Sequence, residues 1–241
     1  MKFAIFSDPH IKSLKNKPKM FEDFILSLNE QVDGFICAGD WASLDLKDIE
    51  DAFSIMRKIT QKPILTVFGN HCHWATESRD LSLDEVFIYH SEMCKKYNIT
   101  YLEEESFETD NSIITGFNGW YYTTNTGTKD LEMLPQQNSY GANPFHVLMK
   151  KAINKLDRAI EVVENSSKQK ICVTHFSFTT DEQYERKSGN IRHLEVIKEH
   201  FNVLICGHSH QKHDTMDGSL RVINPGADYY TYEGFFHIVE F

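Results

Sequence analysis

Residues 2–10 read KFAIFSDPH, a short apolar run that ends in Ser7, Asp8, Pro9 and His10. A run of this length, rich in aromatic and branched side chains, predicts a buried β-strand. The same arrangement returns along the chain: apolar runs at 34–38, 63–68, 171–174 and 203–206 are followed by Gly39-Asp40, Gly69-Asn70-His71, His175 and Gly207-His208-Ser209-His210. Ligands of open α/β sheets gather at the carboxyl ends of strands, so we expect these polar side chains to form one site.

Amphipathic segments separate these runs and predict helices at 18–30, 46–60, 81–97, 145–166 and 190–200. Pro18 and Pro144 suit the first turns of two of them. We expect antiparallel strands in 99–119, with a turn at Asp110-Asn111, and a closing hairpin in 219–241. This order predicts an α/β fold with helices covering two packed sheets.

The chain has 241 residues, of which 41% are hydrophobic and 25% charged, so it can bury a sizeable core. We expect one domain over residues 1–241, with a long functional loop at about 120–144. Neither a signal peptide nor an apolar stretch long enough to cross a bilayer is recognisable, which favours a cytoplasmic protein without a membrane partner.

Charge and cysteine content exclude further classes. Lys and Arg number 25 against 35 Asp and Glu, a net charge of −10 that makes long nucleic acid an unfavourable partner. The five cysteines form no CxxC pair, so neither a disulfide framework nor a zinc ribbon is indicated. Cys37, Cys172 and Cys206 lie in apolar runs and are predicted to be small buried side chains.

The five polar blocks have the order D-x-H, G-D, G-N-H, H and G-H-x-H between residues 8 and 210. In this they resemble the calcineurin-like metallophosphoesterase superfamily, particularly its small prokaryotic or phage-type members. The resemblance implies a four-layer α/β/β/α sandwich of two mixed sheets flanked by helices, with two metal ions. It implies one ion held by Asp8, His10 and His210, a second held by Asn70, His175 and His208, and Asp40 bridging the two.

Such a set of nitrogen and oxygen donors, without thiolate, suits hard or intermediate divalent metals. Manganese is the first choice, with iron, zinc, nickel or cobalt as alternatives. Two adjacent ions deprotonate a water between them, and the resulting hydroxide attacks phosphorus in line with the leaving oxygen. The resemblance makes His71 the general acid that protonates that oxygen, a task suited to imidazole. The alternative is that His71 only hydrogen-bonds its own loop.

Three positions depart from the family pattern. Many members orient the catalytic histidine with an acid where this chain has Ser43, and Asp45 is the nearest substitute. Many also carry Asp or Glu where this chain has Cys72, which is either a packed thiol or an extra soft ligand. No arginine lies between Asp40 and Asp51, unlike in protein Ser/Thr phosphatases, and this favours phosphodiesters over dianionic monoesters.

Substrate contacts are less sharply predicted. Asn70 faces substrate as well as metal in this interpretation, and Trp120 and Tyr121 offer rings against which a base can stack. The alternative is that these aromatics pack the loop onto the body. Arg186 and Arg192 follow His175 and are candidates for phosphate contacts, or else belong to a solvated charged loop.

The sequence therefore predicts a di-metal phosphoesterase acting on a small phosphodiester or nucleotide-type substrate. A nuclease of the DNA-repair type is one alternative, opposed by the net charge and the lack of a DNA-capping domain. A catalytically silent interaction module on the same fold is the other, opposed by the retention of all seven ligand positions. The sequence makes no prediction of the oligomeric state.

Overall fold

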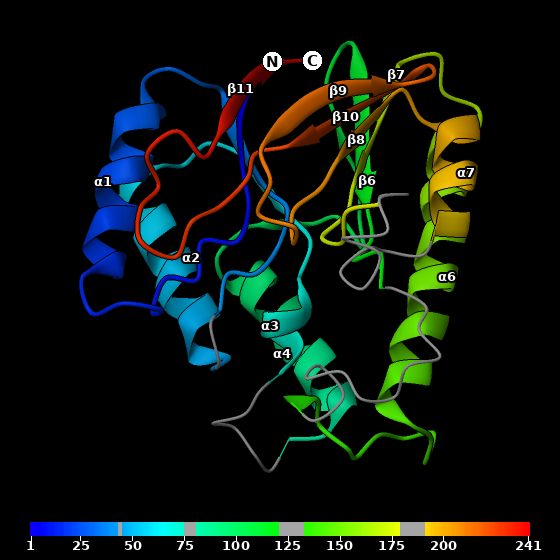
Figure 1. Cartoon of the computed structure of the whole chain (residues 1–241), viewed down its shortest axis with the longest axis horizontal. Coiled ribbons are helices and arrows are strands. Elements are labelled where there is room, and N and C mark those ends of the chain that lie inside the picture. Colours follow the sequence, from blue (N-terminus) through cyan, green and yellow to red (C-terminus); the bar gives the residue numbers. More distant parts are fainter. Residues whose placement is uncertain (43–44, 75–80, 121–132, 179–190) are drawn as a thin grey trace.

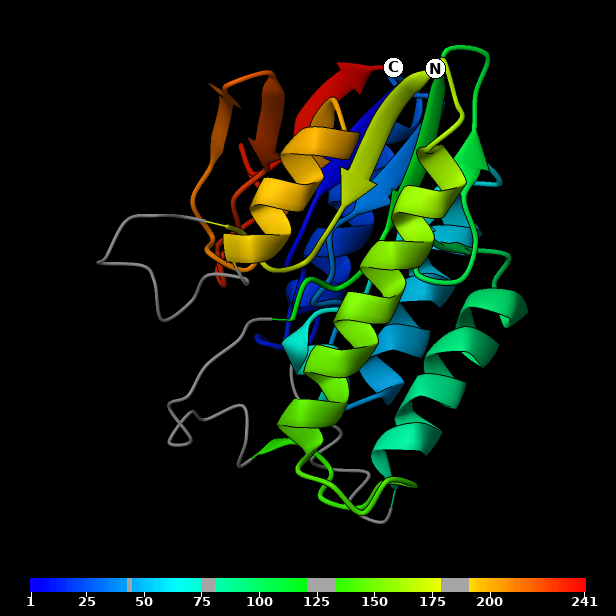
Figure 2. The ribbon, with the colours of Figure 1, turned by 90° about the vertical axis from the view of Figure 1, so that its right-hand side faces the viewer.

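A computed structural model describes residues 1–42, 45–74, 81–120, 133–178 and 191–241 of the chain. Within these residues two β-sheets lie side by side, with helices on the outer face of each (Figures 1 and 2). The first sheet has the strand order β11-β1-β2-β3-β4. Its strands are β1 (Lys2–Phe6), β2 (Gly34–Cys37), β3 (Ile64–Thr66), β4 (Thr100–Tyr101) and β11 (His237–Glu240).

The second sheet has the strand order β5-β6-β7-β8-β10-β9. Its strands are β5 (Phe107–Glu108), β6 (Ser112–Gly116), β7 (Gln169–Val173), β8 (Val203–Ile205), β9 (His213–Asp217) and β10 (Leu220–Asn224). The strands β6, β7, β8 and β10 run parallel, whereas β5 and β9 pair antiparallel at the two edges. Both sheets are therefore mixed, because β11 also pairs antiparallel with β1.

The inner strands are apolar on both faces, which explains their continuous hydrophobic runs. Phe3 and Ile5 of β1 belong to a buried cluster that also contains Ile171 and Val173 of β7, so these side chains fill the space between the sheets. Phe6, on the opposite face of β1, packs in a second cluster with α1 and α2. The alternation of side chains along each strand thus serves two separate cores.

Helices complete the outer layers (Figure 1). Helices α1 (Lys17–Asn29), α2 (Lys47–Ile59) and α4 (Leu83–Lys96) contribute to the core of the first sheet, and α6 (Pro144–Val163) and α7 (Ile191–His200) to that of the second. The side chain of Asn143 accepts the Phe145 N–H at 2.9 Å and so caps α6. Ser82 and Glu85 form a capping box at the start of α4.

These layers confirm the predicted four-layer sandwich of two mixed sheets flanked by helices. The segment 99–119 was only partly predicted correctly. β5 and β6 are antiparallel neighbours around the expected turn, but β4 lies in the other sheet, parallel to β3. A strand of two residues carries too little pattern to indicate which sheet it joins.

The predicted hairpin in 219–241 is wrong. β10 pairs with β8 and β9 in the second sheet, and β11 crosses to the first sheet and pairs with β1. The two termini meet there, where the Met1 amino group donates to the Phe241 carbonyl at 2.8 Å, and Figures 1 and 2 show them side by side. Tertiary pairing between the two ends of the chain has overridden the local turn signals.

The predicted loop at about 120–144 falls partly outside the described residues, since 121–132 are not described. Its second half has little regular structure and is held against α4, where Ser139 N–H donates to the Asp84 carboxylate at 2.6 Å. The single-domain assignment stays a prediction. Among the described helices, none is both long and apolar enough to span a bilayer.

Glu103, just after β4, gives the first testable prediction. Its side chain is 5% exposed, and burial raises its pKa from 4.5 to about 7, although the charge of Lys155 opposes the shift. Between those two pH values the folded chain binds more protons than the unfolded chain, so this group makes stability fall as pH rises. Glu103→Gln should therefore raise the free energy of unfolding above pH 7, by up to about 3 kcal/mol, with little change near pH 4.5.

Urea unfolding of both proteins at pH 5 and pH 8 measures this effect. The exposed neighbour Glu104 supplies the matched control, because Glu104→Gln should change stability little at either pH. An equal effect of Glu103→Gln at the two pH values would contradict the prediction.

Candidate metal centre

The polar residues predicted from the strand ends meet at one place. Three groups of side chains have ligand atoms within 4.8 Å of one another: Asp8, His10 and His210; His10, Asp40 and His71; and Asp40, His175 and His208. They follow β1, β2, β3, β7 and β8, so both sheets contribute. The carboxyl ends of the parallel strands have thus been brought to a common edge, as the sequence predicted.

The first group surrounds the carboxylate of Asp8. His210 Nε2 lies 3.3 Å from Asp8 Oδ1, and His10 Nε2 lies 4.0 Å from the same oxygen. The second oxygen, Oδ2, accepts the backbone N–H of His208 at 3.0 Å. One oxygen of Asp8 therefore fixes the loop after β8, and the other faces the two imidazoles.

Asp40 lies between the first donor group, Asp8, His10 and His210, and a second donor group formed by Asn70, His175 and His208. Its Oδ2 is 3.8 Å from His10 Nε2 and 3.5 Å from His175 Nε2. Its Oδ1 accepts the backbone N–H of His71 at 3.0 Å. A carboxylate in this position can reach a cation in either group, which is the geometry that a bridging ligand requires.

The second group includes the amide of Asn70. Asn70 Oδ1 lies 3.0 Å from His175 Nε2 and 3.1 Å from His208 Nδ1, and these two ring nitrogens are 3.2 Å apart. Three donor atoms thus converge on one point, with Asp40 completing the set. Asn70 is also the first residue of the short helix α3 (Asn70–His73), which Figure 1 shows near the centre of the molecule.

Backbone conformation marks the same residues. Asp8, His10, Asp40, His208 and His210 have φ between 40° and 63°, in the left-handed region that non-glycine residues seldom adopt. Asn98 is the one other non-glycine residue with positive φ in the described part of the chain. Such conformations cost free energy and cluster at functional sites, where the surrounding structure holds them in place.

Backbone carbonyls orient two of the imidazoles. His10 Nδ1 lies 3.0 Å from the Ala42 carbonyl, and His175 Nδ1 lies 2.9 Å from the Ala38 carbonyl. Each ring therefore donates through Nδ1 and keeps Nε2, directed at Asp40, as a lone-pair donor. Metal-ligating histidines are commonly fixed in this way.

Protonation states in the first group favour a metal. Burial lowers the pKa of His10 to about 3. Burial alone would raise the pKa of Asp8, but the neighbouring imidazole of His210, with the charges of His175 and His10, brings it below its ordinary value. Asp8 Oδ1 and His10 Nε2 are buried and make no hydrogen bond within the described residues. A buried carboxylate oxygen and a neutral imidazole nitrogen without partners fit a divalent cation.

Two glycines leave room for these side chains. A Cβ on Gly69 would lie 2.1 Å from Asp40 Oδ1 and 2.6 Å from His175 Cε1. A Cβ on Gly39, where φ is +97°, would lie 2.6 Å from His175 Nδ1. The glycines of the G-D and G-N-H blocks are therefore required by the close approach of Asp40 and His175.

His71 lies beside His10 and Asp40. Its ring centroid is 4.6 Å from that of His10 and 3.6 Å from that of Trp74. The side chain of His71 is half-buried, whereas His10 is 1% exposed. His71 is thus positioned at the border between the candidate metal centre and solvent, held by packing against an indole ring.

The acids considered as partners of His71 have different surroundings. Asp45 Oδ1 accepts the backbone N–H of Lys47 at 2.9 Å, at the start of α2, so its role in orienting His71 stays a prediction. Ser43 lies outside the described residues. Cys72 is fully buried, and burial raises its pKa well above the ordinary value, which is the packed thiol of the two alternatives. Cys37, Cys172 and Cys206 are buried, as predicted.

Of the four predicted substrate contacts outside the donor groups, the structure describes Trp120 and Arg192. Trp120 is 0% exposed and packs against Phe145 and Phe176, with ring centroids 5.8 and 5.2 Å away. It therefore anchors the loop to the core and does not offer a free ring face, which corrects the stacking interpretation. Arg192 lies exposed at the start of α7, and its contact with phosphate stays a prediction. Tyr121 and Arg186 lie outside the described residues.

Two further histidines hold α3 in place, one within the helix and one on α4. His73 Nδ1 lies 2.7 Å from the Gly69 carbonyl, and His90 Nε2 of α4 lies 2.9 Å from the Cys72 carbonyl. Both side chains are 0% exposed. They fix the helix that carries Asn70 and His71, a supporting role that the sequence alone did not assign to them.

Asn224, at the end of β10, was also missed. Its buried amide donates to the Gly207 carbonyl at 2.9 Å and to Ser209 Oγ at 3.0 Å, and accepts the Gly226 N–H at 2.9 Å. The loop that carries His208 and His210 is therefore tied to β10. The tripeptide Asn224-Pro225-Gly226 after a buried strand is the signal that points to it.

Replacing this amide gives a second prediction. Asn224→Leu leaves the Gly226 N–H unpaired and removes one of the two hydrogen bonds to the Gly207 carbonyl, which keeps the Ser209 N–H. We therefore expect the free energy of unfolding to fall by about 1–3 kcal/mol. Because the loop loses its support, affinity for divalent metal should fall about 10- to 100-fold. Thermal unfolding and metal titration measure the two effects. The control Asn154→Leu, on the exposed face of α6, should change neither, and unchanged metal affinity in Asn224→Leu would contradict the supporting role.

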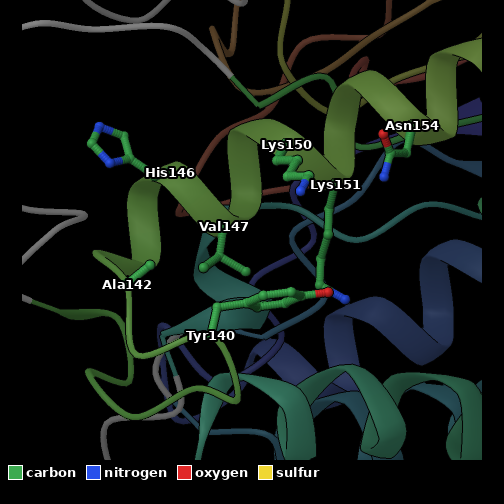
Figure 3. Close-up of a pocket in the computed structure, with 7 residues that line it drawn as sticks. All are labelled: Tyr140, Ala142, His146, Val147, Lys150, Lys151 and Asn154. Carbon is green, nitrogen blue, oxygen red and sulfur yellow. The ribbon is translucent and has the colours of Figure 1, made fainter.

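A separate cavity of about 200 Å³ lies along the N-terminal half of α6 (Figure 3). Tyr140, His146, Lys150 and Lys151 line it, and Figure 3 shows Lys151 extending toward the Tyr140 ring. None of the candidate metal ligands lines this cavity, so it is distinct from the candidate metal centre.

Comparisons with known proteins agree with this geometry. Residues 1–212 match the sequence profile of the calcineurin-like phosphoesterase family. No curated protein sequence matches the chain. Several solved structures share its fold at low sequence identity.

Phosphopantetheinyl hydrolase from Mycobacterium tuberculosis superposes with a TM-score of 0.74 at 16% identity, over 99% of this chain and 95% of that one. The protein TT1561 of Thermus thermophilus gives a TM-score of 0.61 at 16% identity, over 93% and 88% of the two chains. The calcineurin-like phosphoesterase YfkN from Bacillus subtilis gives 0.53 at 12% identity, over 94% and 81%. At these identities the likeness supports the fold alone.

Proposed function

Because the chain belongs to the calcineurin-like phosphoesterase family, we propose that it is a hydrolase of phosphate esters that uses two divalent metal ions. The observation that carries this proposal is the pair of donor groups around Asp40, whose carboxylate lies within 4 Å of an imidazole from each. Donor atoms of this kind and spacing are what a two-metal site requires.

We assign the ligands by position. Asp8, His10 and His210 hold one ion, Asn70, His175 and His208 hold the other, and Asp40 contributes to both. Imidazole, carboxylate and amide donors suit manganese, with iron, zinc, nickel or cobalt as alternatives. When bound, the ions supply a nucleophilic water and offset the charge of the phosphoryl oxygens.

The chain's own residues account for the remaining chemistry. His71 is half-buried beside His10, and in this proposal it donates a proton to the leaving oxygen. Trp74 packs on the His71 ring and restricts its orientation, in place of the acid found in other members. Asp40 also holds the backbone N–H of His71, so it couples the position of the acid to that of the metals.

We propose a phosphodiester as the substrate, with nucleotide-type small molecules as the first class to test. A dianionic monoester calls for a cationic clamp. No arginine lies between Asp40 and Asp51, and the lysines near this segment are engaged elsewhere. Lys12 pairs with Asp48 and Asp51 at 3.0 and 2.7 Å, and Lys47 pairs with Asp51 at 3.0 Å.

The two other functions considered have less support. A DNA-repair nuclease needs a surface that attracts a polyanion, and the net charge of −10 opposes this. A silent interaction module has no need to keep seven donor residues together beside His71, five of them with positive φ. The same residues are compatible with all three functions, so a measurement of hydrolytic activity is needed to distinguish them.

A substrate panel tests the proposal. Protein freed of metal by chelation is reconstituted with Mn, Ni, Zn or Mg and assayed with an aryl phosphodiester, an aryl phosphomonoester, cyclic nucleotides and single-stranded DNA. We expect metal-dependent hydrolysis, fastest on the diester and restored by Mn. Hydrolysis of single-stranded DNA above all other substrates would favour the nuclease. Absence of hydrolysis with every metal would favour the silent module.

A further inference from the structure

The segment between β10 and β11 lies against the first donor group. Figure 1 shows this stretch in red beside α1. Tyr232 OH donates to the Pro9 carbonyl at 2.7 Å, inside the D-x-H block, and the Ala227 N–H lies 3.5 Å from the His210 carbonyl. We call residues 225–232 the closing segment, because they join the two loops that carry Asp8, His10 and His210.

The closing segment is firmly anchored. Lys17, at the start of α1, is 0% exposed, and its Nζ donates to the Asp228 carbonyl at 2.8 Å. The same Nζ lies 4.9 Å from the ring centroid of Tyr232, which in turn stacks on Phe24 at 5.2 Å. A buried ammonium group and a buried tyrosine therefore fix the backbone on both sides of residues 229 and 230.

This anchoring places the ring of Tyr229 over two candidate metal ligands. The ring centroid lies 5.1 Å from that of His10, at an interplanar angle of 27°, and 5.0 Å from that of His210. Yet Tyr229 is 43% exposed, whereas His10 beneath it is 1% exposed. Tyr229 is thus an aromatic surface at the rim of the centre, in contact with it and open to solvent.

The composition of the closing segment defines what it can recognise. Residues 225–236 read PGADYYTYEGFF, with aromatic and acidic residues but neither Lys nor Arg. The ammonium groups that touch this stretch, those of Lys17 and Lys212, donate to the backbone carbonyls of residues 228, 234 and 236. A neutral planar ring can stack on an exposed tyrosine. His71 and Tyr229 make separate contacts with the ring of His10. With the leaving oxygen beside His71 in the proposed function, the ring of Tyr229 is available to the group that remains on phosphorus.

We propose that Tyr229 is a substrate-contacting residue that stacks on a planar ring, such as a nucleobase, in the ester group that is not displaced. This inference rests on the proposed phosphodiesterase function. It gives that function a substrate class: a diester of one phosphate with a neutral ring-bearing alcohol. Stacking between a base and an aromatic side chain is worth about tenfold in affinity or more.

Two substrates with the same leaving group test it: thymidine 5′-(p-nitrophenyl phosphate) and methyl p-nitrophenyl phosphate. Tyr229→Leu should lower kcat/KM for the thymidine ester about tenfold, mainly through KM, and change the methyl ester less than about twofold. Tyr229→Phe keeps the ring and should stay near the original activity. Tyr230→Leu is the matched control, because Tyr230 is 72% exposed and adjacent in sequence.

The outcomes separate this inference from the function on which it rests. Metal-dependent hydrolysis of both esters by the unmodified protein, with an equal effect of Tyr229→Leu on both, overturns the stacking role alone. Loss of metal content in Tyr229→Leu, measured by elemental analysis, also overturns it and makes Tyr229 a cover for the ligands. Failure of the unmodified protein to hydrolyse either ester with any metal overturns both proposals.

Discussion

Asp40→Asn is expected to lower kcat/KM for an aryl phosphodiester about a thousandfold. The side chain keeps its size, so the effect comes from the loss of one negative charge and one oxygen donor. Asp40 Oδ2 is the atom that lies near an imidazole of each donor group, 3.8 Å from His10 Nε2 and 3.5 Å from His175 Nε2. An amide there would offer the two proposed ions either a weaker oxygen ligand or a hydrogen-bond donor.

The metal content should change together with the activity. The unmodified protein is expected to bind two ions per chain and Asp40→Asn one or fewer, measured by elemental analysis after dialysis and by titration calorimetry. Asp40 Oδ1 also accepts the His71 N–H, so the variant loses a support of α3 as well. Excess metal in the assay separates the loss of bound metal from the loss of the hydrogen bond to His71. It restores the occupancy of the metal sites but does not restore the position of His71.

Asp48→Asn provides the matched control. Asp48 is also a buried aspartate, 3% exposed, but it lies on α2 and pairs with Lys12 at 3.0 Å. Its replacement should cost some stability while leaving the number of bound ions at two. Retention of two ions and of activity in Asp40→Asn would contradict the bridging assignment.

Much of the fold could be predicted because a continuous apolar run in the local sequence indicates each inner strand. FAIF, GFIC and ICV, within β1, β2 and β7, are buried on both faces, so their apolar runs are continuous. The longer amphipathic segments between them supply the helices that cover each sheet. The failures lie at the edges. β4 has two residues and β11 joins β1 from the far end of the chain, and neither pairing leaves a mark in the neighbouring sequence.

The candidate ligands could be predicted for a related reason. Each follows a strand directly, and parallel strands deliver their carboxyl ends to one edge, so Asp8 and His208 meet although 200 positions separate them. Residues whose surroundings depend on distant loops could not be placed. Trp120 was predicted to face the substrate, but it is buried against Phe145 of α6. Tyr229 was predicted to lie in a hairpin, but its ring stacks on His10.

His71→Asn gives the second large expected effect. If His71 protonates the leaving oxygen, its loss should matter in proportion to how much the leaving group needs a proton. For a diester with a sugar-hydroxyl leaving group, such as a thymidine dinucleotide, we expect kcat to fall about a thousandfold. For a p-nitrophenyl diester, whose leaving group is stable as an anion, the fall should be about tenfold.

The structure gives this contrast its meaning, because His71 is not one of the seven proposed ligands. His71 is half-buried against Trp74, with ring centroids 3.6 Å apart, and its replacement removes none of the seven proposed ligands. His71→Asn should therefore still bind two ions, and the exposed His146→Asn on α6 should match the unmodified protein in every measurement. An equal fall on both esters would contradict general-acid catalysis and support the alternative in which His71 only holds its own loop. A fall that is about a hundredfold larger for the poor leaving group is the result expected if the proton comes from this side chain, since the proposed metals and attacking water are the same for both substrates.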